Sequence, residues 1–224
     1  MTDKHIVITI DGLVASGKST VSRKLAQKLY FLHVNSGALY RNVAFWAEKQ
    51  KVSLKDENQL EKIAQSLKFE FKLNSAGITE LYVNNMPCSQ EIFNEHIGLL
   101  ASQVSMFPKV RTVATEVQRA QLLNGSLVLE GRDAGSIVFP NAKFKFYLTA
   151  SVEVRAERRL KDQLAQGNPN VNLEEIKENL ERRDYTDTHK GIYSLKITET
   201  TQIIKTDDLD IDEIVELLAV KVKA

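Results

Sequence analysis

The sequence predicts an α/β fold, built on a parallel sheet with helices on both of its faces. Short apolar segments rich in β-branched residues alternate along the chain with longer segments whose apolar residues recur at helical spacing. Strands joined by helical crossovers produce this alternation. The 224 residues allow one large domain or two small ones, and the 43% hydrophobic and 26% charged content is ordinary for a globular chain. Disordered, collagen-like and coiled-coil proteins are therefore excluded.

The first segments follow this alternation. Residues 6–10 are a β-branched run, which predicts a buried strand, and residues 18–30 carry apolar positions at helical spacing. A second short strand is predicted over 31–35, a helix from Ser36 onward, and another helix over 52–66.

In the next segment, apolar residues recur at every second position. Residues 67–73 and 78–83 alternate apolar and polar side chains around a turn signal at 74–77, which predicts an antiparallel hairpin. A third short strand is expected near 86–88. Because an antiparallel hairpin does not fit the alternation of strands and helices around it, we interpret it as part of an inserted module.

The second half of the chain returns to alternating elements. We expect a helix over 107–123, strands at 127–129 and 144–148, a charged helix capped by Ser151, a helix over 173–183, a strand over 202–205 and a helix over 211–222.

Charge and cysteine content exclude several functions. The 30 basic and 29 acidic residues give a net charge of +1, so nonspecific binding to nucleic acids or membranes is not favoured. Cys88 is the single cysteine, which excludes an intramolecular disulfide and a thiolate zinc site. No apolar run approaches the roughly 18 residues of a membrane helix, and the first apolar run is too short for a signal peptide. We expect a cytoplasmic monomer.

A glycine loop lies between the first predicted strand and helix. It matches the pattern G-x-x-x-x-G-K-S/T, in which curled backbone amides and a helix N-terminus hold the phosphates of a nucleotide. Lys18 would reach the β- and γ-phosphates and the Ser19 hydroxyl would hold Mg²⁺. The candidate ATP-binding residues are Gly12, Leu13, Val14, Ala15, Ser16, Gly17, Lys18, Ser19 and Thr20.

A second candidate metal residue is Glu130, which ends the strand at 127–129. A carboxylate there can orient a water molecule of the Mg²⁺ shell, or it can simply be a solvated strand end. The base-reading N-K-x-D and switch D-x-x-G motifs of GTPases are absent. A kinase with a separate acceptor site is the remaining class.

Three arginines on one predicted helix are candidates for contacts with ATP. Arg155, Arg158 and Arg159 lie at positions i, i+3 and i+4. Either neighbouring acidic residues neutralise them, or they belong to a mobile lid that closes over the phosphates. Arg132 and Asp133 follow a predicted parallel strand, at the edge of the sheet where ligands of such folds bind.

Together these residues resemble the bacterial cytidylate kinases, a branch of the nucleoside monophosphate kinase family of P-loop kinases. The likeness spans residues 5 to about 190, and the matching segments occur in the same order as in the family. The matching segments are 8–12, 17–18, 36–41, 101–104, 107–111, 131–135, 138–142, Arg155-Ala156, Arg158-Arg159, Arg183-Asp184 and Asp187.

The resemblance implies a P-loop kinase three-layer fold over a single domain, residues 1–224. A parallel five-stranded sheet would carry an inserted monophosphate-binding module at 38–104, with a small antiparallel sheet, and a short helical lid at 151–187. The implied activity is transfer of the γ-phosphoryl group of ATP to CMP or dCMP, with Mg²⁺, in pyrimidine nucleotide metabolism.

The resemblance also implies roles for individual residues. Lys18, Arg132, Arg158 and Arg159 would be catalytic. Cytosine would be read by Ser102, Arg111 and Asp133, since a carboxylate and a hydroxyl accept from its amino group while an arginine donates to its ring acceptors. Among the other CMP-binding residues, Arg41, Arg132 and Lys190 would hold the phosphate, Arg183 and Asp187 would contact the sugar, and Ser36 would be a further contact in the acceptor site.

The chain departs from the family pattern in its glycine loop, where Leu13, Ala15 and Ser19 replace Pro, Gly and Gly, and at Lys190, where the family has Arg. Two alternatives stay open: a P-loop kinase for another small acceptor such as UMP or AMP, and a nucleotide-binding protein with weak activity.

Overall fold

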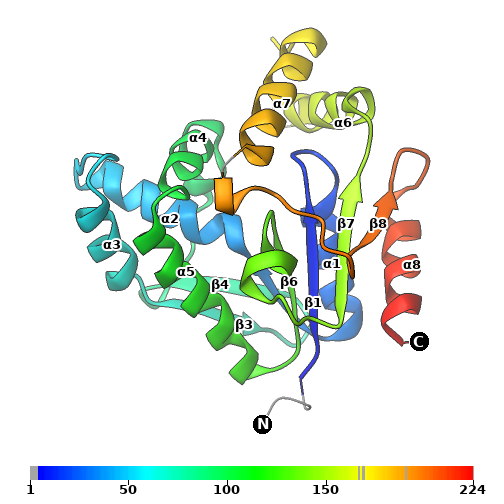
Figure 1. Cartoon of the computed structure of the whole chain (residues 1–224), viewed down its shortest axis with the longest axis horizontal. Coiled ribbons are helices and arrows are strands. Elements are labelled where there is room, and N and C mark those ends of the chain that lie inside the picture. The colour runs from blue at the N-terminus through cyan, green and yellow to red at the C-terminus, as the bar shows by residue number, and fades with distance from the viewer. Residues whose placement is uncertain (1–4, 166, 168–169, 190, 224) are drawn as a thin grey trace.

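A sheet of five parallel strands, in the order β2-β6-β1-β7-β8, forms the centre of the molecule (Figure 1). The computed structural model describes residues 5–165, 167, 170–189 and 191–223. The parallel pairing of all five strands confirms the predicted parallel sheet. Its strands are β1 (Val7–Gly12), β2 (Leu32–Asn35), β6 (Leu127–Gly131), β7 (Phe144–Thr149) and β8 (Gln202–Lys205).

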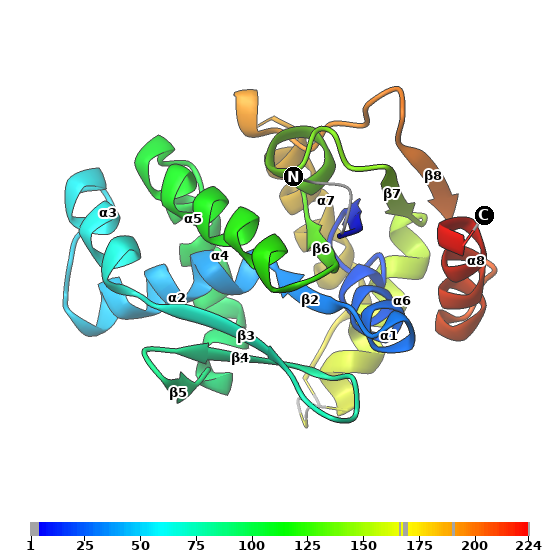
Figure 2. The ribbon, with the colours of Figure 1, turned by 90° about the horizontal axis from the view of Figure 1, so that it is seen from below.

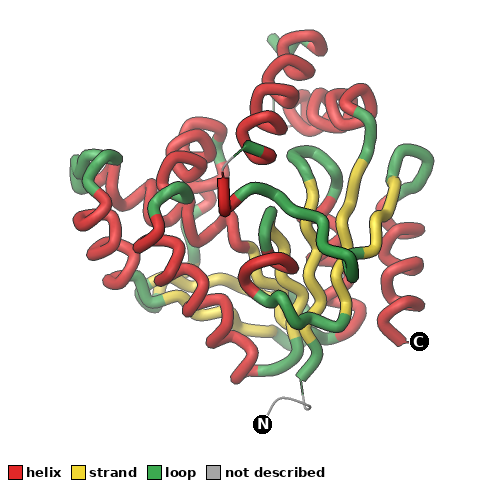
Figure 3. Tube along the Cα trace, viewed as in Figure 1, coloured by secondary structure: helices red, strands yellow, loops and turns green. Residues whose placement is uncertain are grey.

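Helices cover both faces of this sheet, as predicted (Figure 3). On one face, α1 and α8 pack over Ile8, Ile10 and Phe146, and on the other face α2 and α5 pack over Leu127 and Leu129. A 3₁₀ turn over Gln121–Asn124 completes the helix predicted to end at 123. The helices are α1 (Lys18–Leu29), α2 (Ser36–Lys49), α3 (Glu57–Ser66), α4 (Glu95–Val104), α5 (Pro108–Ala120), α6 (Val152–Ala165), α7 (Leu173–Thr188) and α8 (Ile211–Lys223).

The predicted hairpin is present, and a short third strand extends it into a small antiparallel sheet, in the order β3-β4-β5. Figure 2 shows this sheet beside β2 and α2. The backbone N–H of His33 in β2 donates to Thr79 Oγ1 at 2.8 Å, which ties the two sheets together. The strands are β3 (Phe69–Leu73), β4 (Thr79–Val83) and β5 (Met86–Pro87).

Helices α6 and α7 pack against each other at the end of the sheet where β1 and β7 finish (Figure 1). Their small apolar cluster, which includes Ala156, Ile176 and Leu180, also packs against Val14 and Ala15 of the glycine loop. The glycine loop therefore shares a small core with these two helices. The boundaries 38–104 for an insert and 151–187 for a moving lid stay predictions.

Two helices differ in length from the prediction. The helix expected over 52–66 begins only at Glu57, because the carboxylate of Asp56 caps its first turn. The helix expected over 173–183 continues to Thr188, and its polar last turns carried no apolar period that would have revealed them. Across the described residues, no helix combines the length and the apolar character needed to cross a membrane.

Candidate active site

A cavity of about 360 Å³ opens where β1, β2 and β6 end. Most of the candidate residues lie on its wall. Those that line it are Val14, Ala15, Lys18, Ser19, Ser36, Arg41, Ser102, Arg111, Glu130, Arg132, Asp133, Arg159, Arg183 and Asp187. Lys190 lies outside the described residues. Segments from the whole chain therefore converge on one space.

The glycine loop joins β1 to α1, and its first position has space only for a glycine. A Cβ atom on Gly12 would lie 2.5 Å from the backbone oxygen of Leu148 and 2.9 Å from Ser16 Oγ. Gly17 has a φ of 82° and Ala15 a φ of 59°, so the chain curls twice through the left-handed region. Gly17 is also the N-cap of α1.

We expect Gly12→Ala to lower both stability and nucleotide affinity. The methyl group has no space beside the Leu148 carbonyl, so the loop must shift, at a cost of about 1–3 kcal/mol in the free energy of unfolding. Thermal unfolding with and without ATP measures both effects. An unchanged melting temperature together with an unchanged ATP shift would contradict the close approach seen here.

Lys18 is the buried cation at the start of α1. Its Nζ donates to the backbone oxygen of Leu13 at 3.0 Å. Burial, followed by the charge of Arg132, lowers the pKa of Lys18 to about 7, although the charges of Glu130 and Asp187 act in the opposite direction. Because burial makes the charged form of Lys18 unfavourable, a bound polyphosphate would supply a counter-charge that favours the ammonium form.

This shift predicts that nucleotide binding takes up a proton. Above about pH 7 the free protein holds Lys18 increasingly neutral, whereas bound phosphates favour the ammonium form, so affinity for ATP falls as pH rises. Calorimetric titration at about pH 8, in buffers of different ionisation enthalpy, measures the uptake. The Lys18→Met variant loses it. Equal uptake in that variant would assign the proton to another group.

Ser19 and Glu130 place oxygen atoms together beside the loop. Ser19 Oγ donates to Glu130 Oε2 at 2.6 Å, and the residue Glu130 is only 2% exposed. Burial alone would raise the pKa of Glu130, but the hydrogen bond and charge of His33 and the charge of Lys18 outweigh it and hold the pKa low. The carboxylate is therefore ionised.

The donor set here fits a nucleotide-bound Mg²⁺. Within the described ranges, no three His, Cys, Asp or Glu side chains gather as a metal site of their own. Mg²⁺ commonly keeps several water ligands and binds through one or two protein oxygens together with substrate phosphates. The Ser19 hydroxyl and the ionised Glu130 carboxylate, next to the glycine loop, match that requirement.

Several cations crowd the opposite part of the cavity. Burial, followed by the charges of Arg183 and Arg159, lowers the pKa of Arg41 to about 10. Arg41 Nη1 donates to the backbone oxygens of Ile92 and Asn94 at 2.6 and 2.8 Å, so neutral groups hold it. Such an excess of positive charge in one cavity favours an anionic ligand.

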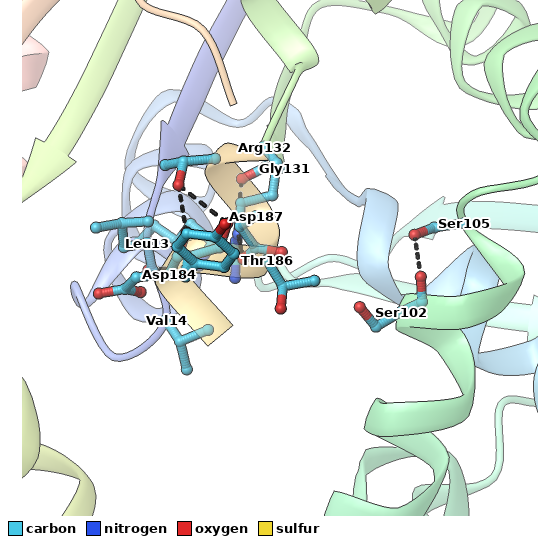
Figure 4. Close-up of polar contacts among 12 residues, drawn as sticks. Leu13, Val14, Ser102, Ser105, Gly131, Arg132, Asp184, Thr186 and Asp187 are labelled. Atoms are coloured by element: carbon cyan, nitrogen blue, oxygen red, sulfur yellow. Dashed lines mark hydrogen bonds and ion pairs between the residues drawn. The ribbon is translucent and has the colours of Figure 1, made fainter. Parts of the chain in front are cut away.

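Arg132 joins this cluster from the end of β6. Its Nε donates to Asp187 Oδ2 at 2.7 Å, and both residues lie near the glycine loop (Figure 4). Ser102 lies opposite them on α4, where Ser105 Oγ donates to its backbone oxygen at 2.8 Å. The cavity therefore has a cation-rich end near the glycine loop and a second polar wall on the side of α4.

That second wall contains a buried ion pair. Arg111 Nη2 pairs with Asp133 Oδ2, and each side chain is 8% exposed. Arg111 Nη1 also donates to the Ser105 backbone oxygen at 3.0 Å. Its guanidinium lies 5.6 Å from the ring centre of Tyr40 and 4.2 Å from that of Tyr193. Donor and acceptor edges are thus held side by side facing the cavity.

The three arginines of α6 separate in the structure. Arg155 is buried, donates to the Val14 backbone oxygen at 3.2 Å and pairs with Asp184. Arg159 lines the cavity. Arg158 instead donates to Oγ1 and the backbone oxygen of Thr206, the residue that directly follows β8. A contact of Arg158 with phosphate therefore stays a prediction that requires movement.

Two functional contacts were missed from the sequence. The carboxylate of Asp11 accepts from the backbone N–H groups of Ala134 and Gly135 at 2.9 and 2.8 Å, which fixes the loop after Asp133. His33 Nε2 lies 3.1 Å from Glu130 Oε1. The position of Asp11 directly before the glycine loop was a usable signal, whereas nothing in the sequence pattern linked His33 to Glu130.

The fold and this cavity define a P-loop protein of the small-molecule kinase class. Residues 8–224 match the family model described as cytidylate kinase, and the chain belongs to the cytidylate kinase family.

Curated relatives agree with this assignment. A cytidylate kinase of a Geobacillus species is 38% identical over 212 residues, covering 95% of this chain and 94% of the relative. A bifunctional pantoate ligase/cytidylate kinase of Prochlorococcus marinus is 35% identical over 210 residues, covering 94% of this chain. The chain spans only 41% of that bifunctional relative.

A solved structure shares the fold alone. The crystal structure of an uncharacterized protein from Eubacterium ventriosum aligns with a TM-score of 0.57 at 12% identity, covering 98% of this chain and 99% of that one.

Proposed function

We propose that this protein transfers the γ-phosphoryl group of ATP to CMP or dCMP, releasing ADP and CDP or dCDP. The observation that carries the proposal is the single cavity that Lys18 of the glycine loop shares with the Arg111–Asp133 pair. Membership of the cytidylate kinase family supports it. We further propose a cytoplasmic monomer that uses no nucleic-acid partner.

The glycine loop would hold ATP. Its backbone amides and the N-terminus of α1 face the polyphosphate, and Lys18 neutralises charge on the transferring group. Ser19 and Glu130 would hold Mg²⁺ directly or through water, and the ion would neutralise negative charge on the phosphate oxygens. Arg159, and Arg158 after movement of α6, would add positive charge at the same place.

The cation cluster would hold the acceptor phosphate. Arg41 and Arg132 are the described residues proposed for it, together with Lys190 and with Ser36 nearby. Arg183 and Asp187 would contact the sugar. The attacking group is already an anionic phosphate oxygen, so the chain needs no strong general base, and positioning with charge neutralisation supplies the rate enhancement.

The buried pair on the second wall would select the base. Cytosine presents an amino donor beside ring acceptors, which matches the Asp133 carboxylate and the Arg111 guanidinium, and the Ser102 hydroxyl would accept from the same amino group. Uracil would set its carbonyl oxygen against the carboxylate. Repulsion between two acceptors therefore disfavours UMP.

An acceptor panel tests the proposal. ADP release is followed with ATP and, in turn, CMP, dCMP, UMP and AMP. We expect kcat/KM for CMP or dCMP to exceed that for UMP and AMP by at least about 10²-fold. Highest activity with UMP or AMP would favour another acceptor, and tight binding of ATP and CMP without ADP release would favour a nucleotide-binding protein.

A further inference from the structure

Glu130 is held at both of its carboxylate oxygens. Oε2 accepts from Ser19 at 2.6 Å, and Oε1 lies 3.1 Å from Nε2 of His33. The Glu130 side chain is 2% exposed and the His33 side chain 14% exposed, so water competes little for either contact. The first partner, Ser19, belongs to α1, whereas the second, His33, belongs to β2 and has no role in the function proposed above.

Strand order produces this contact. β2 lies beside β6 in parallel register, with His33 opposite Val128 and Asn35 opposite Glu130. Because alternate residues of a strand share a face, His33 and Glu130 lie diagonally on one face of the sheet. The backbone of His33 is itself fixed, since its N–H donates to Thr79 of β4.

Hydrogen-bond chemistry sets the direction of the contact. An ionised carboxylate only accepts, so Nε2 of His33 carries the hydrogen, whether the ring is neutral or charged. The low pKa of Glu130, to which His33 contributes, agrees with an ionised acceptor. The contact therefore needs a donor at this place but no change of protonation on the histidine.

We propose that His33 is a positioning residue for the nucleotide-bound Mg²⁺: its N–H fixes one Glu130 oxygen, so that the other stays directed at Ser19 and the cation. This inference rests on the metal role proposed for Ser19 and Glu130. Removing the donor leaves a buried carboxylate oxygen unpaired and free to turn. Loss of such outer contacts typically weakens metal affinity about 10–100-fold.

Binding of ADP with and without Mg²⁺ isolates this effect from catalysis. The ratio of the Kd for ADP in EDTA to the Kd for ADP in Mg²⁺ measures how strongly the cation tightens the nucleotide. His33→Phe keeps the ring shape without a donor. We expect it to lower this ratio about tenfold while the Kd in EDTA stays within about twofold.

Two further variants identify the hydrogen bond as the cause. The amide of His33→Gln can reach the place of Nε2, and we expect it to retain most of the ratio. The amide of His33→Asn is too short and should lose the ratio as Phe does, which also provides a second test if the Phe variant unfolds. His96→Phe, at an exposed histidine that contacts Glu48, is the matched control.

The outcomes separate this inference from the metal assignment. An unchanged ratio in both the Phe and Asn variants overturns the role of His33, and so does an equal loss in all three variants or an equal weakening with and without Mg²⁺. If the parent protein itself shows no tightening by Mg²⁺, the metal role of Ser19 and Glu130 fails first and this inference fails with it.

Discussion

Replacing Lys18 with alanine lowers kcat about 10³-fold and changes the Kd for CMP by less than about threefold. Lys18 stands at the start of α1 inside the cavity, where its ammonium group would meet the β- and γ-phosphates. Charge stabilisation in a water-poor site counts mainly in the transition state. Steady-state kinetics and calorimetric titration with CMP measure the two quantities separately.

The control for this variant is Lys24→Ala. Lys24 lies on the same helix, but it is exposed and pairs with Asp212 at the surface. Exposed ion pairs contribute only about 0–1 kcal/mol to the free energy of unfolding. Because Lys24 does not line the cavity, its replacement should leave kcat unchanged. Loss of the same size in both variants would indicate damage to α1, and full activity of Lys18→Ala would remove the lysine from the mechanism.

Replacing Asp133 with asparagine lowers kcat/KM for CMP about 10²- to 10³-fold and narrows the preference for CMP over UMP. An amide can donate to the uracil oxygen that a carboxylate repels. Asparagine is chosen over alanine because Arg111 is buried, and removing its partner outright costs about 3–5 kcal/mol. The acceptor panel with the variant measures the change.

The matched control is Asp56→Asn. Asp56 caps α3 outside the cavity, and asparagine caps a helix about as well as aspartate does. The preference of the Asp56→Asn variant for CMP over UMP should equal that of the parent protein. If Asp133→Asn also keeps the parent's preference, base selection belongs to other residues, and the role proposed for the Arg111–Asp133 pair is wrong.

Local patterns were enough to predict the framework of the site. The strand, glycine loop and helix around Gly12 and Lys18 are adjacent in the sequence, so their geometry follows from local conformation. The hairpin was predicted for the same reason, because its alternation and its turn at 74–77 are local. Arg132 and Asp133 were placed at the cavity because parallel strands present their ends at one edge of the sheet.

Contacts between distant segments could not be predicted in this way. His33 meets Glu130 only because β2 lies next to β6, and no local signal gives the order of strands in a sheet. The spacing of the α6 arginines placed all three on one side of a helix. The structure divides them, since Thr206 offers Arg158 a different partner from that of Arg155.

The most direct test of the central claim follows the phosphoryl group itself. The protein is incubated with ATP labelled in its γ-phosphate and with CMP, and the products are separated. Label should appear in CDP in step with the formation of ADP, with little in inorganic phosphate. Label that goes to inorganic phosphate alone, or that stays in ATP while both nucleotides bind, would contradict transfer between two ends of one cavity.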